Sequence, residues 1–425
     1  MAERLAAEVV VVGAGPAGIA AAVHAAEAGR SVALLDPGPR PGGQLWRHLD
    51  QAPAAARPWL ARLARGGLLL VPEATVVDAP RPLTLLVDRG GRPLHVHYQA
   101  LVLACGAREL FLPFPGWTLP GVIGAGAAQA LRESGARFDA QRVVVGGSGP
   151  LLLAVAAALR TAGARVVGIV EQARPIPLAR FAAGLLRSPR RLAQALGYAA
   201  RLGGVPLRTS AWVKEAIGRE RLERVAISDG RCSSTWDCDV LACGYGLVPN
   251  LELPRLLGCD CEALPACDAL QVRVDGSQRT SVPSVFAAGE LCGIGGVDQA
   301  LVTGTIAGLC AAGVPVPSRL QRRRERERAF ARRLAVAFAP RSELRRLATP
   351  DTVVCRCEDV TLGRIAALPG ERRGAKLLAR AGMGACQGRV CGPALGFLFG
   401  WSDDNVRPPL VPASLGLLAE EEEKP

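Results

Sequence analysis

Short apolar runs alternate along the chain with glycine turns and alanine-rich segments. Residues 9–12 are four valines, residues 13–18 contain three glycines, and an alanine-rich segment then leads to a second apolar run at 32–35. A continuous apolar run of this length predicts a buried parallel strand, and the alanine-rich segment after a turn predicts a helix. Strand, glycine turn, helix and strand in this order begin a doubly wound α/β sheet.

This order occurs twice. Residues 143–150, which read Val-Val-Val-Gly-Gly-Ser-Gly-Pro, repeat the pattern of residues 9–16 more than a hundred positions later. So long a spacing indicates two copies of a whole domain rather than a solenoid of short repeats. After the second copy, residues 280–290 predict one more strand and a glycine-acid turn, which have no neighbour in that copy. We therefore assign this strand to the first sheet, which makes the second domain an insertion in the first.

The predicted fold is α/β, with two doubly wound dinucleotide-binding domains, the second inserted in the first, and a small cysteine-bearing C-terminal domain. Residues 321–328 are dense in Arg and Glu and predict an exposed linker helix. The Pro-rich and then acidic end predicts a loose tail. The predicted boundaries are 1–122 with 279–314 for the first domain, 123–278 for the inserted domain, 315–350 for the linker helix, 351–400 for the cysteine-bearing domain and 401–425 for the tail.

Composition and charge narrow the function. The chain has 425 residues, of which 49% are hydrophobic, so it can bury more than one core. The net charge of +13 comes mainly from Arg, yet only 4% of the residues are aromatic and none is interleaved with a basic stretch, so nucleic acid is not expected as a partner. Glycines interrupt the apolar N-terminal segment, and no other run reaches the roughly 20 apolar residues of a membrane-spanning helix. We expect a cytoplasmic protein without an integral membrane segment.

The first glycine turn has the spacing Gly-x-Gly-x-x-Gly between a strand and a helix, and an acid ends the next strand. Gly13 permits the tight turn, Gly15 lets the backbone approach a pyrophosphate, and Gly18 allows the helix to pack on the strand. Asp36 can accept both hydroxyls of an adenosine ribose, and its charge repels a 2′-phosphate. The residues predicted to bind a dinucleotide here are Gly13, Gly15, Pro16, Ala17, Gly18 and Asp36.

The second glycine turn departs from this spacing. Gly147 and Gly149 are present, but Leu152 stands where a third glycine would allow close packing of the helix. The departure either widens the nucleotide site or leaves it vacant. If a nucleotide does bind, Glu171 favours NAD over NADP because its charge repels a 2′-phosphate.

The strongest cofactor signal is a group of cysteines near the C-terminus. The chain has 13 cysteines, and we identify no export signal in it. An odd number of cysteines in such a chain favours metal ligands and buried thiols over a disulfide framework. Four of them form a C-x-C and a C-x4-C motif, which suit either a 2Fe-2S cluster or a structural zinc. Arg356, Arg380 and Arg389 lie nearby in the sequence and would offset the charge of a thiolate-bound cluster. The predicted ligands are Cys355, Cys357, Cys386 and Cys391.

Three further segments resemble the two-dinucleotide-domain flavoprotein reductases. They are the turn 42–44, the strand end 104–106 and the late turn 288–290. The resemblance implies that the first copy binds FAD, that the second is an NAD(P)-type domain, and that Glu290, where these reductases usually have Asp, contacts the ribityl chain. The redox cysteine pair of the disulfide reductases has no counterpart beside the first turn or in the second copy up to residue 211, so disulfide reduction is not expected. The cofactor-binding residues that this resemblance adds are Gly42, Gly43, Gln44, Gly106, Gly289 and Glu290.

Segments 354–360, 380–391 and 113–122 resemble the flavoprotein subunits of bacterial amine dehydrogenases. This group comprises the B subunit of hydrogen cyanide synthase, the A subunit of opine oxidase, D-hydroxyproline dehydrogenase and the sarcosine oxidase alpha subunit. The cysteine-bearing domain is also similar to bacterioferritin-associated ferredoxin, which has C-x2-C in place of C-x4-C. The resemblance implies a C-terminal iron-sulfur domain with a 2Fe-2S cluster, and a hetero-oligomer with an amine-oxidase-like flavoprotein subunit that oxidises the substrate.

Together these parts predict an FAD- and 2Fe-2S-containing oxidoreductase subunit. It would pass on electrons from the oxidation, by its partner, of an amino or imino acid of the opine, hydroxyproline, glycine or sarcosine type. No residue stands out as a general base for amine oxidation, so the catalytic residues are unknown. One alternative is a stand-alone NAD(P)H-dependent flavoprotein reductase with NAD on the second copy. Another is a zinc-bearing, non-catalytic scaffold.

Overall fold

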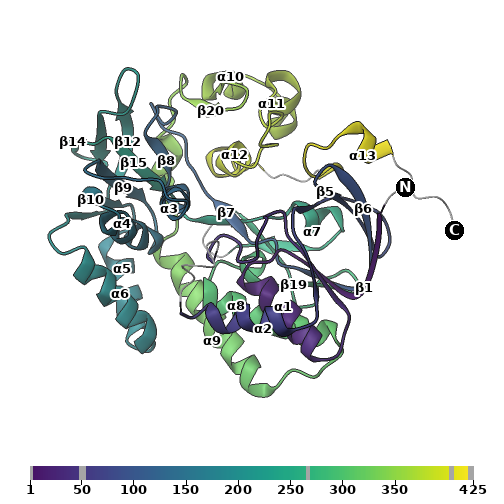
Figure 1. Cartoon of the computed structure of the whole chain (residues 1–425). Helices are drawn as coiled ribbons and strands as arrows, with labels where there is room; N and C mark the ends of the chain where they lie inside the picture. The colour runs from purple at the N-terminus through teal and green to yellow at the C-terminus, as the bar shows by residue number, and fades with distance from the viewer. Residues whose placement is uncertain (1–2, 47–53, 265–268, 402–405, 420–425) are drawn as a thin grey trace.

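The valine run near the N-terminus lies in β1 (Glu3–Val12), an inner strand of the first sheet (Figure 1). β1 pairs in parallel with β2 (Val32–Leu35) on one side and with β6 (Arg92–Leu103) on the other. All four valines are buried, as an uninterrupted apolar run predicts for a strand that is covered on both faces. The computed structural model describes residues 3–46, 54–264, 269–401 and 406–419.

A late strand completes this sheet. β19 (Val285–Ala287) pairs in parallel with the last three residues of β6. The segment between these two strands therefore leaves the sheet and returns to it. This topology confirms the predicted insertion of one dinucleotide-binding domain in the other.

The helix after the first glycine turn, α1 (Pro16–Glu27), packs against α8 (Val297–Ala311), which follows β19 (Figure 1). Glycines permit this contact. A Cβ atom at Gly304 would lie 2.1 Å from the carbonyl oxygen of Ala17, and one at Gly308 would lie 2.2 Å from that of Ala21. The two backbones thus approach more closely than any larger residue allows, which holds the first glycine turn against the turn after β19.

The inserted domain has its own five-stranded parallel sheet, with the order β11-β10-β9-β15-β8, and a three-stranded antiparallel sheet, β12-β13-β14. The second glycine turn joins β9 (Arg142–Gly147) to α4 (Leu151–Thr161). Leu152, which replaces the third glycine, is buried in the core of this domain. The two connections to the first domain, β7 (Ala107–Glu109) and β16 (Leu247–Pro249), pair as an antiparallel ribbon.

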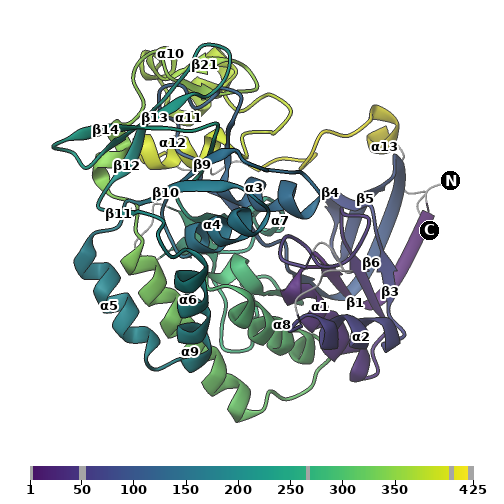
Figure 2. The ribbon, with the colours of Figure 1, turned by 60° about the vertical axis from the view of Figure 1, so that its left-hand side comes forward.

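The cysteine-bearing residues form a small module with its own core. It contains the hairpin β20 (Val353–Cys355) and β21 (Val360–Thr361), and the last helix of the module is α12 (Cys391–Phe399). Figure 2 shows the module beside the antiparallel sheet of the inserted domain. Trp117 joins the two, because its ring N–H donates a hydrogen bond of 2.6 Å to the carbonyl oxygen of Val353.

Two C-terminal segments are more closely packed than the sequence suggests. The charged run does form a helix, α9 (Ser318–Ala337), but its Glu327 makes a largely buried ion pair with Arg191 of the inserted domain. The expected loose tail is wrong for residues 406–419. Leu417 is buried among residues of the first sheet, and the backbone N–H of Leu410 donates to that sheet at 2.8 Å. Apolar burial against the outer strands thus fixes this part of the chain.

Among the described residues, no helix is both long enough and apolar enough to cross a bilayer.

The remaining elements are α2 (Arg57–Arg65), β3 (Leu69–Val71), β4 (Ala74–Arg81), β5 (Thr84–Arg89), β8 (Val122–Gly124), α3 (Ala125–Glu133), β10 (Arg165–Glu171), α5 (Pro175–Leu185), α6 (Pro189–Arg201), β11 (Leu207–Thr209), β12 (Trp212–Ile217), β13 (Arg224–Ser228), β14 (Ser233–Asp237), β15 (Val240–Gly244), α7 (Glu252–Leu256), β17 (Cys261–Ala263), β18 (Leu270–Val272), the 3₁₀ helices η2 (Gly289–Cys292) and η3 (Ser342–Arg346), α10 (Leu362–Ala366), α11 (Glu371–Ala379) and α13 (Leu415–Ala419).

Candidate functional site

The first glycine turn forms an open cradle at the end of β1. Gly13 has a φ of 103°, and a Cβ atom there would lie 2.4 Å from the carbonyl oxygen of Ala104. A Cβ atom on Gly18 would lie 1.7 Å from the carbonyl oxygen of Gly13. At Gly15, in contrast, the nearest atom to such a Cβ is the Cα of Gly43, 4.0 Å away. Two of the glycines therefore serve packing, and the third leaves space for a ligand at the start of α1.

Asp36 lies beside this cradle. Its carboxylate accepts hydrogen bonds from the backbone N–H of Ala14 at 2.6 Å and from that of Gly38 at 2.8 Å, one on each oxygen. Each oxygen keeps a second lone pair that a ribose hydroxyl can use. The backbone N–H of Gly42 donates to the carbonyl oxygen of Ala14 at 2.8 Å, which brings the turn 42–44 to the same place.

The late acid lies across from this turn. A Cβ atom on Gly289 would be 2.8 Å from the Cβ of Ala17, so the turn after β19 touches the start of α1. Glu290 accepts a hydrogen bond from the N–H of Gly296 at 2.8 Å on Oε1, while Oε2 is shielded from solvent without a partner in the described chain. Burial raises the pKa of Glu290 to about 7. A shielded carboxylate oxygen without a donor fits a ligand with hydroxyl groups, such as the ribityl chain of FAD.

A cavity of about 420 Å³ extends from Glu290 to the inserted domain. Glu109, Tyr245 and Gln299 line it, and none of them was identified from the sequence. Burial raises the pKa of Glu109 to about 7, although the carboxylate accepts a hydrogen bond of 2.9 Å from the N–H of Gly126. For Glu109, the sequence signal that could have indicated burial is its place directly before the apolar residues 110–112.

The second glycine turn keeps the geometry of the first at its two glycines. Gly147 has a φ of 135°, and a Cβ atom there would lie 1.8 Å from the carbonyl oxygen of Gly244. Glu171 is 5% exposed and accepts hydrogen bonds from the N–H of Gly149 at 2.7 Å and of Ala173 at 2.9 Å. Burial raises its pKa to about 7. Each copy thus directs its acid at its own glycine turn.

The four predicted ligand cysteines lie together in the C-terminal module as two pairs. The thiol of Cys357 interacts with that of Cys386, and the thiol of Cys391 with that of Cys355. Among the described residues, no three His, Cys, Asp or Glu side chains surround one point as the ligands of a single metal ion would. A 2Fe-2S cluster needs two thiolates on each iron, whereas zinc needs four around one centre. Either group would use the four thiols of these two motifs as its donors.

Backbone amides converge on these sulfurs. The N–H of Gly382 donates to the Sγ of Cys355 at 3.4 Å. Burial opposes the ionisation of Cys386, but the N–H groups of Val390, Gly388 and Arg389 and the neighbouring Cys357 thiol together lower its pKa. N–H donors of this kind stabilise thiolate ligands.

The arginines near the cysteines have other partners as well. Arg380 donates to Glu358 at 2.7 Å, and Arg356 lies over the ring of Trp117, 5.9 Å from its centroid. Arg389 donates to the carbonyl oxygens of Cys386 at 3.4 Å and of Leu410 at 2.7 Å. Arg356 and Arg389 lie within the two cysteine motifs themselves, and Arg380 contacts Glu358, which directly follows Cys357.

A chain of polar contacts joins the residues that follow β6 in the first domain to the C-x4-C segment. Asn250 donates to the carbonyl oxygen of Cys105 at 2.8 Å, and its own backbone N–H donates to that of Gly106 at 3.1 Å. Arg108 then donates to the Oδ1 of Asn250 at 2.7 Å and to the carboxylate of Glu252. Burial alone would raise the pKa of Glu252, but the charge and hydrogen bond of Arg108, its own backbone N–H and the charge of Arg389 together lower that pKa. The same Glu252 lies 3.9 Å from Arg389, which completes the link.

Comparison with known proteins supports the assignment of the fold. The model of the family described as pyridine nucleotide-disulphide oxidoreductase matches residues 7–306. The chain belongs to this family. It is a flavin-dependent oxidoreductase with the fold of the two-dinucleotide-domain reductases.

Two curated relatives are similar over almost their whole length. Hydrogen cyanide synthase subunit HcnB of Pseudomonas aeruginosa is 34% identical over 441 residues, which cover 94% of this chain and 92% of the relative. The A subunit of opine oxidase from Agrobacterium tumefaciens is 31% identical over 437 residues, which cover 90% and 84%. These two proteins belong to the group of flavoprotein subunits that the sequence resembles, so the resemblance to that group is confirmed. The iron-sulfur cluster that the resemblance implies stays a prediction.

Solved structures show the same fold. L-proline dehydrogenase from P. horikoshii has a TM-score of 0.72 at 20% identity, with 99% of this chain and 81% of that chain covered. Thioredoxin reductase from T. acidophilum has a TM-score of 0.56 at 20% identity and covers 72% of this chain and 98% of its own. The first match includes the C-terminal module, whereas the second leaves more than a quarter of this chain uncovered.

Proposed function

We propose that the chain is the FAD- and 2Fe-2S-bearing redox subunit of a cytoplasmic, heteromeric amino- or imino-acid dehydrogenase. A partner subunit, itself an amine-oxidase-like flavoprotein, oxidises an opine, hydroxyproline, glycine or sarcosine type of substrate, and this chain passes the electrons on. The observation that carries the proposal is the polar link from Gly106 through Glu252 to Arg389, because it ties the flavin turn to the cysteine loop.

The residues of the chain have distinct roles in this proposal. Bound FAD takes up two electrons as a hydride and gives them up singly, and a 2Fe-2S cluster accepts one electron at a time. With FAD bound, Gly15 would make room for its pyrophosphate, Asp36 would accept hydrogen bonds from its ribose hydroxyls, and the Oε2 of Glu290 would accept one from a ribityl hydroxyl. The thiolates of Cys355, Cys357, Cys386 and Cys391 would hold the cluster.

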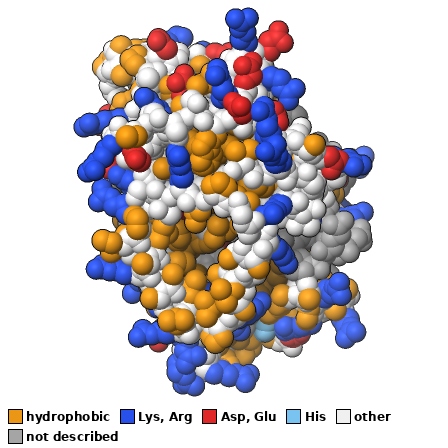
Figure 3. Space-filling model, turned by 90° about the vertical axis from the view of Figure 1, so that its left-hand side faces the viewer, with side chains coloured by type: hydrophobic (Ala, Val, Ile, Leu, Met, Phe, Trp, Pro, Cys, Tyr) orange, Lys and Arg blue, Asp and Glu red, His pale blue; other side chains and the backbone are white. Residues whose placement is uncertain are grey.

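An apolar surface of the inserted domain supports the existence of a partner. Neither α5 nor α6 buries a residue, and Ile176, Leu186 and Leu196 are all more than half exposed. Figure 3 shows hydrophobic side chains gathered around a hollow on this side of the molecule. Contiguous exposed apolar surface of this kind is typical of protein interaction sites. The relatives named as subunits agree with a partner.

Anaerobic stopped-flow spectroscopy tests the proposal. The chain is mixed with substrate amine in the presence and in the absence of the co-expressed partner, and flavin absorbance is followed. We expect flavin bleaching only when the partner and the amine are both present, followed by a spin-half iron signal in electron paramagnetic resonance.

The second turn and Glu171 favour one alternative, a reductase that takes its electrons from NADH without a partner. Rapid bleaching of the isolated chain by NADH would contradict our proposal in favour of that alternative. Zinc in place of iron in metal analysis would contradict the electron-transfer role altogether.

A further inference from the structure

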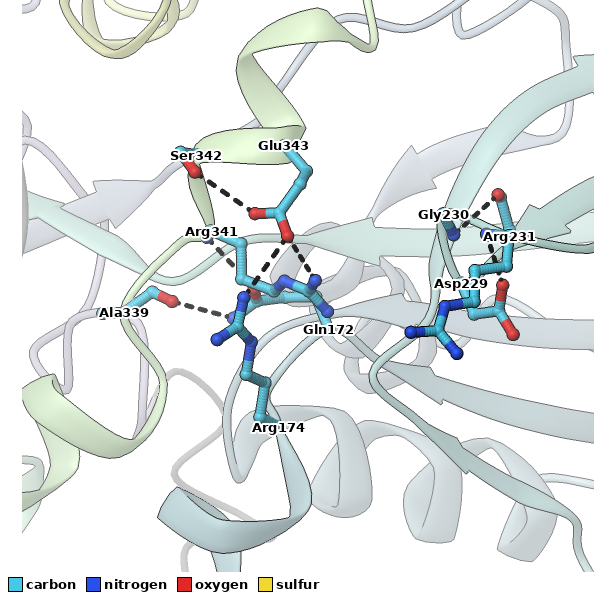
Figure 4. A network of polar contacts seen from close by, with 10 residues as sticks. Gln172, Arg174, Asp229, Gly230, Arg231, Ala339, Arg341, Ser342 and Glu343 are labelled. Carbon is cyan, nitrogen blue, oxygen red and sulfur yellow. Dashed lines mark hydrogen bonds and ion pairs between the residues drawn. The ribbon is translucent and has the colours of Figure 1, made fainter.

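The residues after α9 lie beside the second glycine turn. Figure 4 shows Ala339 and Arg341 of this segment in contact with Gln172. The hydroxyl of Ser148, in the middle of that turn, donates to the carbonyl oxygen of Phe338 at 2.9 Å. The side-chain amide of Gln172 donates to the carbonyl oxygen of Ala339 at 3.1 Å and accepts from the backbone N–H of Arg341 at 3.1 Å. We call residues 338–341 the strap.

The inserted domain contains side chains that are specific to this contact. Gln172 has no exposed surface and Ser148 is 4% exposed, so both are committed to the strap. The amide nitrogen of Gln172 also donates to the hydroxyl of Ser148 at 2.9 Å, which fixes the orientation of both groups. In the first copy the corresponding positions hold Ala14 and Pro37, whose side chains form no hydrogen bonds.

A second layer of contacts holds the strap from outside. Glu343 accepts hydrogen bonds from Arg341 and, at 3.5 Å, from Arg174 of the inserted domain (Figure 4). The guanidinium of Arg341 lies 4.9 Å from the ring centroid of Trp212. Phe338 packs edge-on against Phe181 of α5, with ring centroids 5.2 Å apart. Polar and aromatic contacts therefore anchor both ends of the strap.

The position of the strap coincides with the adenosine half of a dinucleotide site. In a doubly wound domain, the pyrophosphate lies on the glycine turn and the adenosine ribose on the acid that ends the second strand. Ser148 belongs to that turn, and Gln172 directly follows the acid Glu171. The cavity beside Gly149 is bounded on this side by residues 338–340.

We propose that the strap fills the adenosine half of the second dinucleotide site and excludes NADH from it. The strap thereby determines which reductant reaches the flavin. This inference goes beyond the proposed function, which assigns no occupant to the inserted domain. It requires only contacts within the described chain.

The test is a titration of the full chain with NADH, followed by isothermal calorimetry. For the wild type we expect a Kd weaker than about 0.5 mM. The double variant Ser148→Ala, Gln172→Ala lacks the two side chains that bond the strap to the second glycine turn, and we expect it to bind NADH at least about tenfold more tightly. The matched control is Ser188→Ala, Gln194→Ala, at the residue before α6 and within α6 of the same domain, which should bind as the wild type does.

Two results would overturn the inference. One is saturable binding of NADH to the wild type with a Kd below about 0.5 mM. The other is a double variant that has a native circular dichroism spectrum and retains its flavin, yet binds NADH no more tightly than the wild type. Failure of the proposed function would appear instead as a missing iron signal or as flavin that partner and amine cannot reduce, and this titration measures neither.

Discussion

The same substitution, glycine to alanine, should have opposite effects in two helices of this protein. Gly18 lies in α1 and Gly197 in α6. Alanine favours a helix over glycine by about 0.5–1 kcal/mol at either position, because it loses less backbone entropy on folding. The surroundings differ. No atom lies within 4 Å of a Cβ placed on Gly197, whereas a Cβ on Gly18 would lie 1.7 Å from the carbonyl oxygen of Gly13.

The clash at Gly18 cannot be relieved by a side chain, because the atom it meets belongs to the backbone of the glycine turn. α1 would have to move away from β1, and overpacking of this kind costs about 1–3 kcal/mol. We therefore expect Gly18→Ala to lower the free energy of unfolding by roughly 0.5–2 kcal/mol after the helix gain is subtracted. We expect Gly197→Ala to raise it by about 0.5–1 kcal/mol.

Urea-induced unfolding, followed by circular dichroism, measures both changes. Flavin absorbance of the purified variants provides a second measurement, since a displaced α1 spoils the cradle around Gly15. Gly18→Ala should therefore be purified with little FAD, and Gly197→Ala with the wild-type amount. If Gly18→Ala were at least as stable as the wild type and fully yellow, the packing of α1 on the first turn would be different from the one described.

Three further predictions concern charge and sulfur. In urea titrations, Glu252→Gln should lower the free energy of unfolding by about 1–3 kcal/mol near neutral pH. Because folding lowers the pKa of Glu252, this difference from the wild type should vanish in acid. The exposed control Glu220→Gln should show no difference at either pH. Cys386→Ser should abolish the iron signal in electron paramagnetic resonance while leaving flavin absorbance intact, and the exposed Cys232→Ser should change neither. Burial raises the pKa of Glu109 to about 7, so its contribution to stability is present in acid and is lost as the pH rises through that value. Glu109→Gln should therefore unfold at the same urea concentration as the wild type near about pH 5, and at a higher urea concentration than the wild type near about pH 8.

The parts of the fold that the sequence predicts are those determined by local geometry. A glycine with a positive φ between a buried strand and an alanine-rich helix leaves few alternatives, so the first turn, its acid and the second copy are all recognisable. The C-x-C and C-x4-C motifs likewise predict two ligand loops, because cysteines so close in the sequence must also lie close together in space. The contacts missed from the sequence join residues that are far apart in the chain. Arg108 and Glu252 come from different connections between the domains, and no periodicity marks such a pair.

Duplication also explains why the glycine turn of the inserted domain does not by itself indicate a bound nucleotide. A copy that keeps Gly147, Gly149 and Glu171 retains the two glycines and the acid of the turn, although Leu152 replaces the third glycine. Each of them has an internal role: Gly147 avoids the backbone of Gly244, and Glu171 accepts the N–H of Gly149. The motif can therefore persist for the stability of the domain alone, whether or not a nucleotide binds. The two copies differ at Ser148 and Gln172, whose buried side chains bind the strap instead of the turn's own backbone. Measurements of NADH binding to variants of these two residues decide whether the second copy still binds a nucleotide.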